Sequence, residues 1–170
     1  ISRMGKVEDG NTVSDYDKME VERGYSINTS VVPILWKENK INFIDTPGYF
    51  DFVGEVNAAL RAAEAAVIMV DAGSGIQVGT EAAWKACERY KTPRFIVINK
   101  RDKDEFDFYK TFGELKDKFG EKLIPFSWPL SAEIDEELKE AIAMTDDELM
   151  EKYFNGDDFS DEEVLRGLKK

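Results

Sequence analysis

The apolar residues of this chain recur with two different spacings, one typical of strands and one typical of helices. Short β-type runs are expected at 31–36, 40–44, 66–70 and 94–98. Helical spacing occurs at 52–65, 80–91 and 107–119. The first two runs are joined by a short polar link, which predicts an antiparallel hairpin. The alternation of strands and helices predicts an α/β fold with crossover helices packed on the sheet.

The two ends of the chain have a different character. Residues 1–30 are polar and irregular, and we expect them to be mostly loop, while a further short strand is expected at 123–128. From Ser131 onward the chain is acidic, and its spacing predicts helices at 133–144, 146–154 and 160–168. The expected N-caps of the last two are Thr145 and Ser160, because a glutamate follows each after three residues, the spacing of a capping box.

The composition excludes several classes of function. The 170 residues include 35 Asp and Glu, 23 Lys and Arg and no histidine, so the formal net charge is −12. We therefore expect no general or sequence-specific nucleic-acid binding by this chain, since attraction to phosphates needs an excess of Lys and Arg. Without histidine there is no Ser-His-Asp triad, no His-ligated zinc and no imidazole base. Hydrophobic residues make up 42% of the chain, which is enough to fill a core.

Cysteine use and hydropathy indicate the compartment. The single Cys87 cannot form an internal disulfide, which suits a reducing cytosol, and we expect a cytoplasmic protein. The longest apolar stretch, 62–70, is interrupted by Glu64 and is too short to span a bilayer. No membrane partner is therefore expected.

The motif Asp45-Thr46-Pro47-Gly48 directly follows the second expected strand. A carboxylate at a strand end can hold a hydrated Mg²⁺ through its water shell. The backbone N–H of Gly48 can approach a phosphate because no side chain stands in the way. Asp, Pro and Gly are also the usual residues of a plain surface turn, and taken alone the motif favours that interpretation.

The motif Asn99-Lys100-Arg101-Asp102 follows the last of these strands. The carboxylate of Asp102 can accept hydrogen bonds from N1–H and N2–H₂ of guanine, whereas adenine offers no such pair of donors, so this residue would select guanine. Asn99 can bond base acceptors and tie neighbouring loops together, and the stem of Lys100 can lie along the base plane. A charged loop at a strand end explains the same residues about equally well.

A third, hydroxyl-bearing segment, Glu22-Arg23-Gly24-Tyr25-Ser26-Ile27, precedes both motifs. In this order, and on these elements, the three weak signals together form the pattern of a GTP-binding domain. From about Gly5 to its C-terminus the chain resembles the translational GTPases, most closely the elongation factor G family. The similarity includes residues 45–52, 70–75, Gln77, Thr80-Glu81 and 146–153.

The resemblance implies a three-layer, P-loop GTPase-like sheet flanked by helices, and a GTPase that acts on the ribosome in protein synthesis with hydrolysis coupled to translocation. It implies GTP or GDP and Mg²⁺ as cofactors, and the ribosome as a partner through the full-length parent. Residues 1–130 would form the GTP-binding domain and 131–170 its acidic helical tail. Three alternatives stay open: a divergent GTP-binding paralogue with little hydrolysis, a tetracycline-resistance-type ribosome protection protein, and an α/β domain with no nucleotide site.

The resemblance also implies roles for single residues. Ser26 stands where the family's first switch has a Thr bound to Mg²⁺, and Asp45 would hold the same ion through water. The amide of Gly48 would face the γ-phosphate. Segments near 10–30 and 48–60 would change their order with the nucleotide. Guanine would be read by Asn99, Lys100 and Asp102.

Several parts of the family pattern are missing from these residues. The phosphate-binding loop G-x-x-x-x-G-K-[ST] is absent, and Gly5 to Thr12 has only its glycine spacing, with Asn11 where Lys is needed. We therefore expect the chain to begin after the first strand and this loop, to have unpaired strand edges beside a gap in its sheet, and to bind GTP weakly by itself. The family's inserted subdomain is missing near 129–133, and Ser131-Ala132 is no substitute for its last guanine-contacting segment.

The residue after the Asp-Thr-Pro-Gly motif is Tyr49, where the family has a catalytic histidine that orients the attacking water. A phenol releases its proton only near pH 10, so Tyr49 is not a general base at pH 7, although its oxygen can bond a water. Tyr25 likewise replaces a smaller apolar residue beside this site. We therefore expect slow or altered hydrolysis, with Tyr49 and Gly48 as the candidate catalytic residues.

Overall fold

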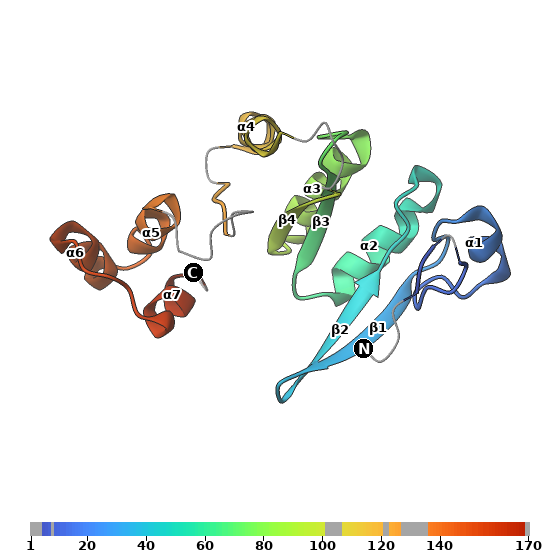
Figure 1. Ribbon diagram of the computed structural model, residues 1–170, viewed down its shortest axis with the longest axis horizontal. Helices are drawn as coiled ribbons and strands as arrows, with labels where there is room; N and C mark the ends of the chain where they lie inside the picture. The colour runs from blue at the N-terminus through green and yellow to red at the C-terminus, as the bar shows by residue number, and fades with distance from the viewer. Residues whose placement is uncertain (1–4, 8, 101–106, 121–122, 127–135, 169–170) are drawn as a thin grey trace. The chain divides into compact units, whose positions relative to one another are not determined.

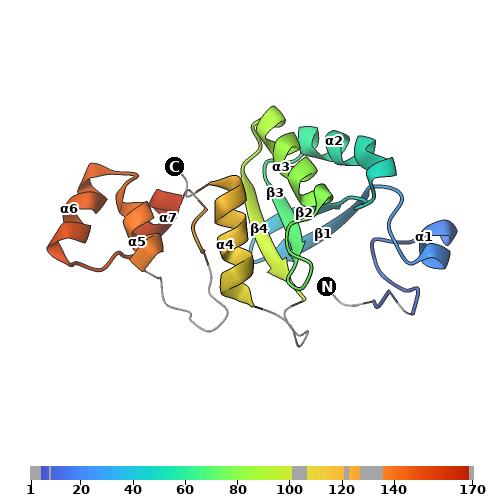
Figure 2. The ribbon, with the colours of Figure 1, turned by 90° about the horizontal axis from the view of Figure 1, so that it is seen from above.

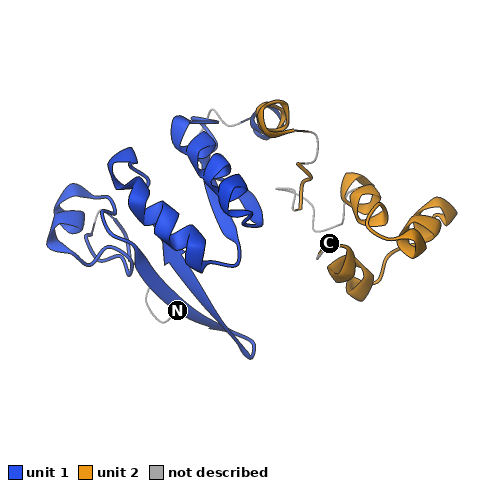
Figure 3. Ribbon diagram, turned by 180° about the vertical axis from the view of Figure 1, so that it is seen from behind, with its two compact units in different colours: residues 1–111 blue, residues 112–170 orange. Residues whose placement is uncertain are grey.

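The computed structural model describes residues 5–7, 9–100, 107–120, 123–126 and 136–168 (Figure 1). The chain divides into two compact units, residues 1–111 and 112–170 (Figure 3). The elements are α1 (Lys18–Arg23), β1 (Ser30–Trp36), β2 (Asn39–Asp45), the 3₁₀ turn η1 (Phe50–Phe52), α2 (Val53–Ala62), β3 (Ala66–Asp71), α3 (Val78–Tyr90), β4 (Arg94–Asn99), α4 (Phe108–Phe119), α5 (Glu136–Ala143), α6 (Asp147–Asn155) and α7 (Asp161–Leu168).

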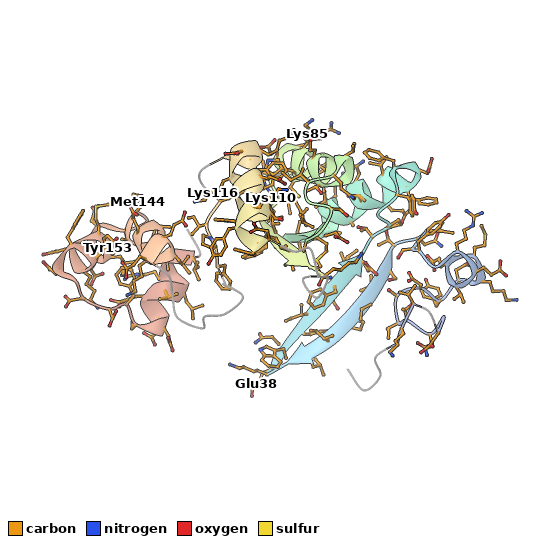
Figure 4. The ribbon with its side chains drawn as sticks, turned by 45° about the horizontal axis from the view of Figure 1, so that its top comes forward. Glu38, Lys85, Lys110, Lys116, Met144 and Tyr153 are labelled. Atoms are coloured by element: carbon orange, nitrogen blue, oxygen red, sulfur yellow. The ribbon has the colours of Figure 1, made fainter. Side chains whose placement is uncertain are left out.

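Strands β1 and β2 form the expected antiparallel hairpin. Ser30 lies opposite Asp45 at its open end, and Trp36 lies opposite Asn39 beside the turn. Lys37 has φ of 51°, the left-handed conformation that tight hairpin turns require, and Glu38 lies at the tip (Figure 4). The residues that follow Asp45 therefore leave the hairpin at the end opposite its turn.

Strands β3 and β4 pair in parallel, as expected for two strands joined by a crossover helix. Asp71 lies opposite Asn99 where both strands end. Helix α3 packs against β3, and α2 packs against α3 (Figure 2). The most deeply buried apolar side chains of this layer are Val70 and Cys87, each 1% exposed. Burial of these apolar side chains is the main force that holds the helices on the strands.

The four strands lie in two separate two-stranded sheets, β1–β2 and β3–β4, rather than in one sheet. Strands β2 and β3 follow each other in the chain but are not hydrogen-bonded to each other in the described residues. On one face of β3–β4 the apolar side chains Val67, Met69, Phe95 and Val97 are exposed. Their register places Val67 opposite Phe95 and Met69 opposite Val97, so they form one continuous patch.

The second unit has its own core, made by α5, α6 and α7. Leu138, Ile142 and Leu149 are buried together, and Phe159 and Val164 pack against them. An ion pair between Lys116 of α4 and Glu137 connects α4 to this group (Figure 4). None of the helices in the described part of the chain is long and apolar enough to cross a membrane.

Helix capping in this unit confirms one expectation and corrects another. The backbone N–H of Ser160 donates to Glu163 and that of Glu163 to the Ser160 hydroxyl, so the expected capping box is present. The Ser160 N–H, together with Lys152 and the Ser160 hydroxyl, lowers the pKa of Glu163 to about 2. The N-cap of α6 is Asp146, not Thr145, because the Thr145 hydroxyl instead donates to the Ile142 carbonyl.

One further expectation needs refinement and one is wrong. Within the segment expected to be mostly loop, residues 18–23 form α1, because Asp17 and Glu20 close a capping box at its start. Residues 123–126 form no strand, and 127–128 lie outside the described residues. The expected C-terminal end of α4 is confirmed, since Gly120 follows with φ of 105° and its N–H donates to the Lys116 carbonyl.

In the second unit, α7 packs closely against α5 at Gly167. A methyl group added at Gly167 of α7 would lie 2.7 Å from Cγ2 of Ile142. We expect Gly167→Ala to lower the free energy of unfolding by about 1–2 kcal/mol, because overpacking outweighs the helix propensity gained. The matched change Gly113→Ala in α4 meets no atom within 4 Å and should be neutral or stabilising. Urea unfolding of both variants tests this, and equal midpoints would contradict it.

Candidate functional site

The Asp-Thr-Pro-Gly segment leaves the open end of the hairpin. Asp45 is the last residue of β2, and Pro47 is fully buried and fixes the path of the chain. Gly48 is exposed, and a Cβ built there would meet nothing within 4 Å beyond its chain neighbours. The described structure therefore gives no internal steric reason for glycine at 48. An approaching ligand that uses its backbone N–H would supply one.

One ring contact brings the hydroxyl-bearing segment beside this turn, and a hydrogen bond holds Thr29, just after that segment, against α2. The rings of Tyr25 and Tyr49 lie 4.5 Å apart between centroids, with planes inclined by 47°. The backbone N–H of Thr29 donates to Glu55 of α2 over 3.0 Å. Tyr49 itself is 55% exposed. The structure thus brings Tyr25 into contact with Tyr49, beside which the resemblance had placed it, and leaves the Tyr49 ring accessible.

Ser26 makes a contact that the sequence did not predict. Its hydroxyl donates to Oδ1 of Asp15 over 2.7 Å, so this Oγ is engaged within its own segment. No group of three or more His, Cys, Asp or Glu side chains in the described ranges is placed to hold a metal ion. A hydrated Mg²⁺ bound mainly through water and phosphate needs fewer protein ligands than a closed protein cage does.

The segment around Ser26 is organised by a buried carboxylate, Glu20, which is 2% exposed. Its Oε1 accepts the backbone N–H groups of Ile27 and Asn28 at 3.0 and 2.9 Å, and its Oε2 accepts that of Asp17. Burial acts to raise the pKa of Glu20, but these N–H groups outweigh it and hold the pKa below its usual value. Glu20 thereby anchors the residues that follow Ser26 to α1.

Glu20→Gln should destabilise this segment, because the amide keeps only one acceptor oxygen for three N–H donors. We expect a loss of about 1–3 kcal/mol at neutral pH. Since the native pKa is lowered, the contribution of Glu20 is present above the ordinary carboxyl range and is lost as pH falls through the native pKa. Urea unfolding at pH 7 and in acid, with the exposed Glu22→Gln as control, measures it. Equal midpoints for the two variants at pH 7 would show that Glu20 is not an anchor.

The second group of candidate residues lies where β3 and β4 end. Asn99 is the last residue of β4, and its carbonyl accepts the N–H of Ala72 over 2.8 Å. Lys100 has φ of 60°, and its Nζ lies 3.0 Å from Oδ2 of Asp71. Asp102, the residue expected to select guanine, lies outside the described residues. Sequence reasoning included Asp71 in the similar segment 70–75 but gave it no role, although an Asp with Gly and Ser two and three residues later is a usual sign of a side chain that bonds its own loop.

The structure therefore assembles the candidates in two groups. Ser26, Asp45, Gly48 and Tyr49 belong to the open end of the β1–β2 hairpin and its neighbouring segment. Asn99 and Lys100 belong to the end of the β3–β4 sheet. Within the first unit, α2 follows β2 through η1 and packs on α3, which packs on β3.

Comparison with known proteins identifies the class to which this arrangement belongs. The model of the elongation factor Tu GTP-binding domain family matches residues 1–167. The chain therefore belongs to this family of translational GTPase domains.

Particular relatives are elongation factors G. That of Granulibacter bethesdensis is 43% identical over 131 residues, covering 77% of this chain and 19% of that protein. That of Thermotoga maritima is 32% identical over 207 residues, covering 98% of this chain and 30% of that protein. A crystal structure of a protein from Thermus thermophilus superposes with a TM-score of 0.84 at 32% identity, covering 98% of this chain and 31% of that one. The chain thus spans less than a third of each relative.

Proposed function

We propose that this chain is a GTP-binding domain of an elongation factor G-like translation factor, which hydrolyses GTP on the ribosome during protein synthesis. The observation that carries the proposal is the placement of the motifs within a chain that belongs to this family. Each of the two strand-end motifs directly follows a strand. In α/β sheets, nucleotides bind beyond the carboxyl ends of the strands. Guanine nucleotide would be the ligand, and the ribosome the partner of the whole protein.

The roles of the residues follow from their chemistry. Asp45 would hold Mg²⁺ through water, and Ser26 would exchange its hydrogen bond with Asp15 for a direct bond to the ion. The N–H of Gly48 would donate to the γ-phosphate, a role supported by the open space around this glycine. Mg²⁺ would neutralise phosphate charge as the terminal bond breaks. Guanine would be recognised by Asn99, Lys100 and Asp102.

The separation of the strands into two sheets supports an incomplete nucleotide fold in these residues. A further strand between β2 and β3 would pair with both and join the sheets into one. The alignment with the Thermotoga maritima factor runs over 207 residues, longer than the 170 residues here, so that relative has additional residues within the matched region. We assign residues 1–130 to the GTP-binding domain and 131–170 to its acidic helical tail.

One observation favours a second candidate, a protein that uses GTP as a conformational ligand with little hydrolysis. Tyr49 places an exposed phenol, packed on Tyr25, beside the turn that would face the γ-phosphate. A phenol oxygen can orient a water but cannot remove its proton at neutral pH.

GTP turnover by the protein expressed from its complete coding sequence, measured with and without ribosomes, tests the proposal and separates the two candidates. An elongation-factor function predicts turnover that ribosomes stimulate. Nucleotide binding without stimulated turnover would favour the second candidate. Failure to bind any guanine nucleotide would overturn both.

A further inference from the structure

The ends of β3 and β4 are connected by an ion pair between Asp71 and Lys100. The two strands are in register so that Asp71 lies opposite Asn99, one residue before Lys100. From this position Oδ2 of Asp71 reaches Nζ of Lys100 over 3.0 Å. The side chain of Asp71 is 20% exposed and that of Lys100 58% exposed. Asp71 is thus the more buried partner of this ion pair, and Lys100 is the more exposed partner.

Asp71 is held by bonds that do not involve Lys100. Its Oδ1 accepts the backbone N–H groups of Gly73 and Ser74 at 3.0 and 3.1 Å, and its carbonyl accepts that of Gly75 at 2.9 Å. One carboxylate oxygen therefore fixes the loop, and the other is aimed at the lysine. An exposed ion pair is usually weak because two mobile side chains must both be ordered, but here the carboxylate is already ordered.

The backbone of Lys100 has a defined local conformation at the end of β4. Its φ of 60° lies in the left-handed region, which few residues other than glycine adopt and which Lys37 and Lys91 of this chain share. The bond from Ala72 N–H to the Asn99 carbonyl fixes the residue before it. The ion pair restrains the far end of the side chain, so both ends of Lys100 are held and its methylene stem lies between them.

We propose that Asp71 is a positioning residue for the guanine site: it holds the Lys100 ammonium so that the lysine stem lies ready against the face of the purine. Asp71 touches no nucleotide. It acts by removing the rotamer entropy that Lys100 would otherwise lose on binding, since a free lysine side chain has several rotatable bonds. The inference rests on the proposed function and adds to it a residue that lies outside the three motifs.

The test is a double-mutant cycle on the protein expressed from its complete coding sequence. The variants are Asp71→Asn, Lys100→Met and both together, and the measurement is the dissociation constant for fluorescent GDP. Asn at 71 keeps an oxygen for Gly73 and Ser74 and removes the charge that faces Lys100. Glu88→Gln is the matched control, because it removes a comparable ion pair, with Arg94 at 3.6 Å, from the opposite end of β4.

We expect Asp71→Asn to weaken GDP binding about 10-fold and Glu88→Gln to leave it unchanged. Adding Asp71→Asn to Lys100→Met should cause no further loss, since the residue acts only through the lysine. Thermal unfolding without nucleotide gives a second readout, in which Asp71→Asn should resemble Glu88→Gln. Independent, multiplying effects on affinity, or no effect of Asp71→Asn, would overturn this inference alone. A wild-type protein that binds no GDP would overturn the proposed function and this inference with it.

Discussion

Replacing Asp102 by asparagine is expected to change the preferred base from guanine to xanthine. The carboxylate offers two acceptors to the N1–H and N2–H₂ donors of guanine. An asparagine offers one acceptor and one donor, which match N1–H and the C2 carbonyl of xanthine. Against guanine the asparagine N–H₂ would face the N2 amine. Both groups are donors, so neither would have an acceptor. We expect GDP binding to weaken about 100-fold and xanthosine diphosphate to bind more tightly than GDP.

Competition of GDP and xanthosine diphosphate for a bound fluorescent nucleotide measures this exchange. The matched control is Asp107→Asn, which removes the same charge five residues later. Asp107 caps the start of α4 through a bond from Lys110 N–H, and an asparagine oxygen can keep that bond. The control should keep the preference for GDP. A variant at 102 that still prefers GDP to the xanthine nucleotide would show that Asp102 does not read the base.

Changing Tyr49 to histidine is expected to raise ribosome-stimulated GTP turnover by about 100-fold, because a positioned general base typically contributes a factor of this size or more. Tyr49 is exposed and lies directly after Gly48, so an imidazole there could reach a water beside the γ-phosphate. Nucleotide affinity should change little, since the phenol makes no contact that the guanine site requires.

Histidine also breaks the ring contact between Tyr25 and Tyr49, and a control must separate that effect from chemistry. Tyr49→Leu removes the ring, and with it the ring contact, but supplies no base. It should therefore show no gain in turnover. A wild-type protein that already turns over GTP as fast as Tyr49→His would contradict the view that Tyr49 limits hydrolysis.

The elements that the sequence predicted best are those marked by an apolar run along most of their length. Strands β3 and β4 are continuous apolar runs, and the hairpin has a polar link with a strand on each side. The run at 123–126 has the same β-type residues but forms no strand, because strand propensity is realised only when a neighbour supplies hydrogen bonds and packing. Helix α1 was missed because six residues carry too little periodicity, and its capping box was the only available signal.

The candidate site could be predicted as a set of motifs but not as a set of contacts. The sequence placed Asp45 and Asn99 at strand ends, because the apolar runs stop there. It could not show that Ser26 donates to Asp15 or that Asp71 pairs with Lys100, since these contacts depend on how loops fold back and on the register of two strands. The resemblance placed Tyr25 beside the site of Tyr49, but the ring contact between these residues, which are 24 positions apart, came only from the structure.

The choice of base by the intact protein is the most direct test of the proposed guanine-nucleotide function. Fluorescent GDP bound to the product of the complete coding sequence would be displaced by GDP, ADP or inosine diphosphate. Adenine lacks the N1–H and N2–H₂ donors and hypoxanthine lacks only the amine, so GDP should bind tightest, inosine diphosphate next and ADP weakest, with GDP and ADP differing by at least about 100-fold. Equal displacement by GDP and ADP, or no binding of the fluorescent nucleotide, would contradict a guanine site in this chain.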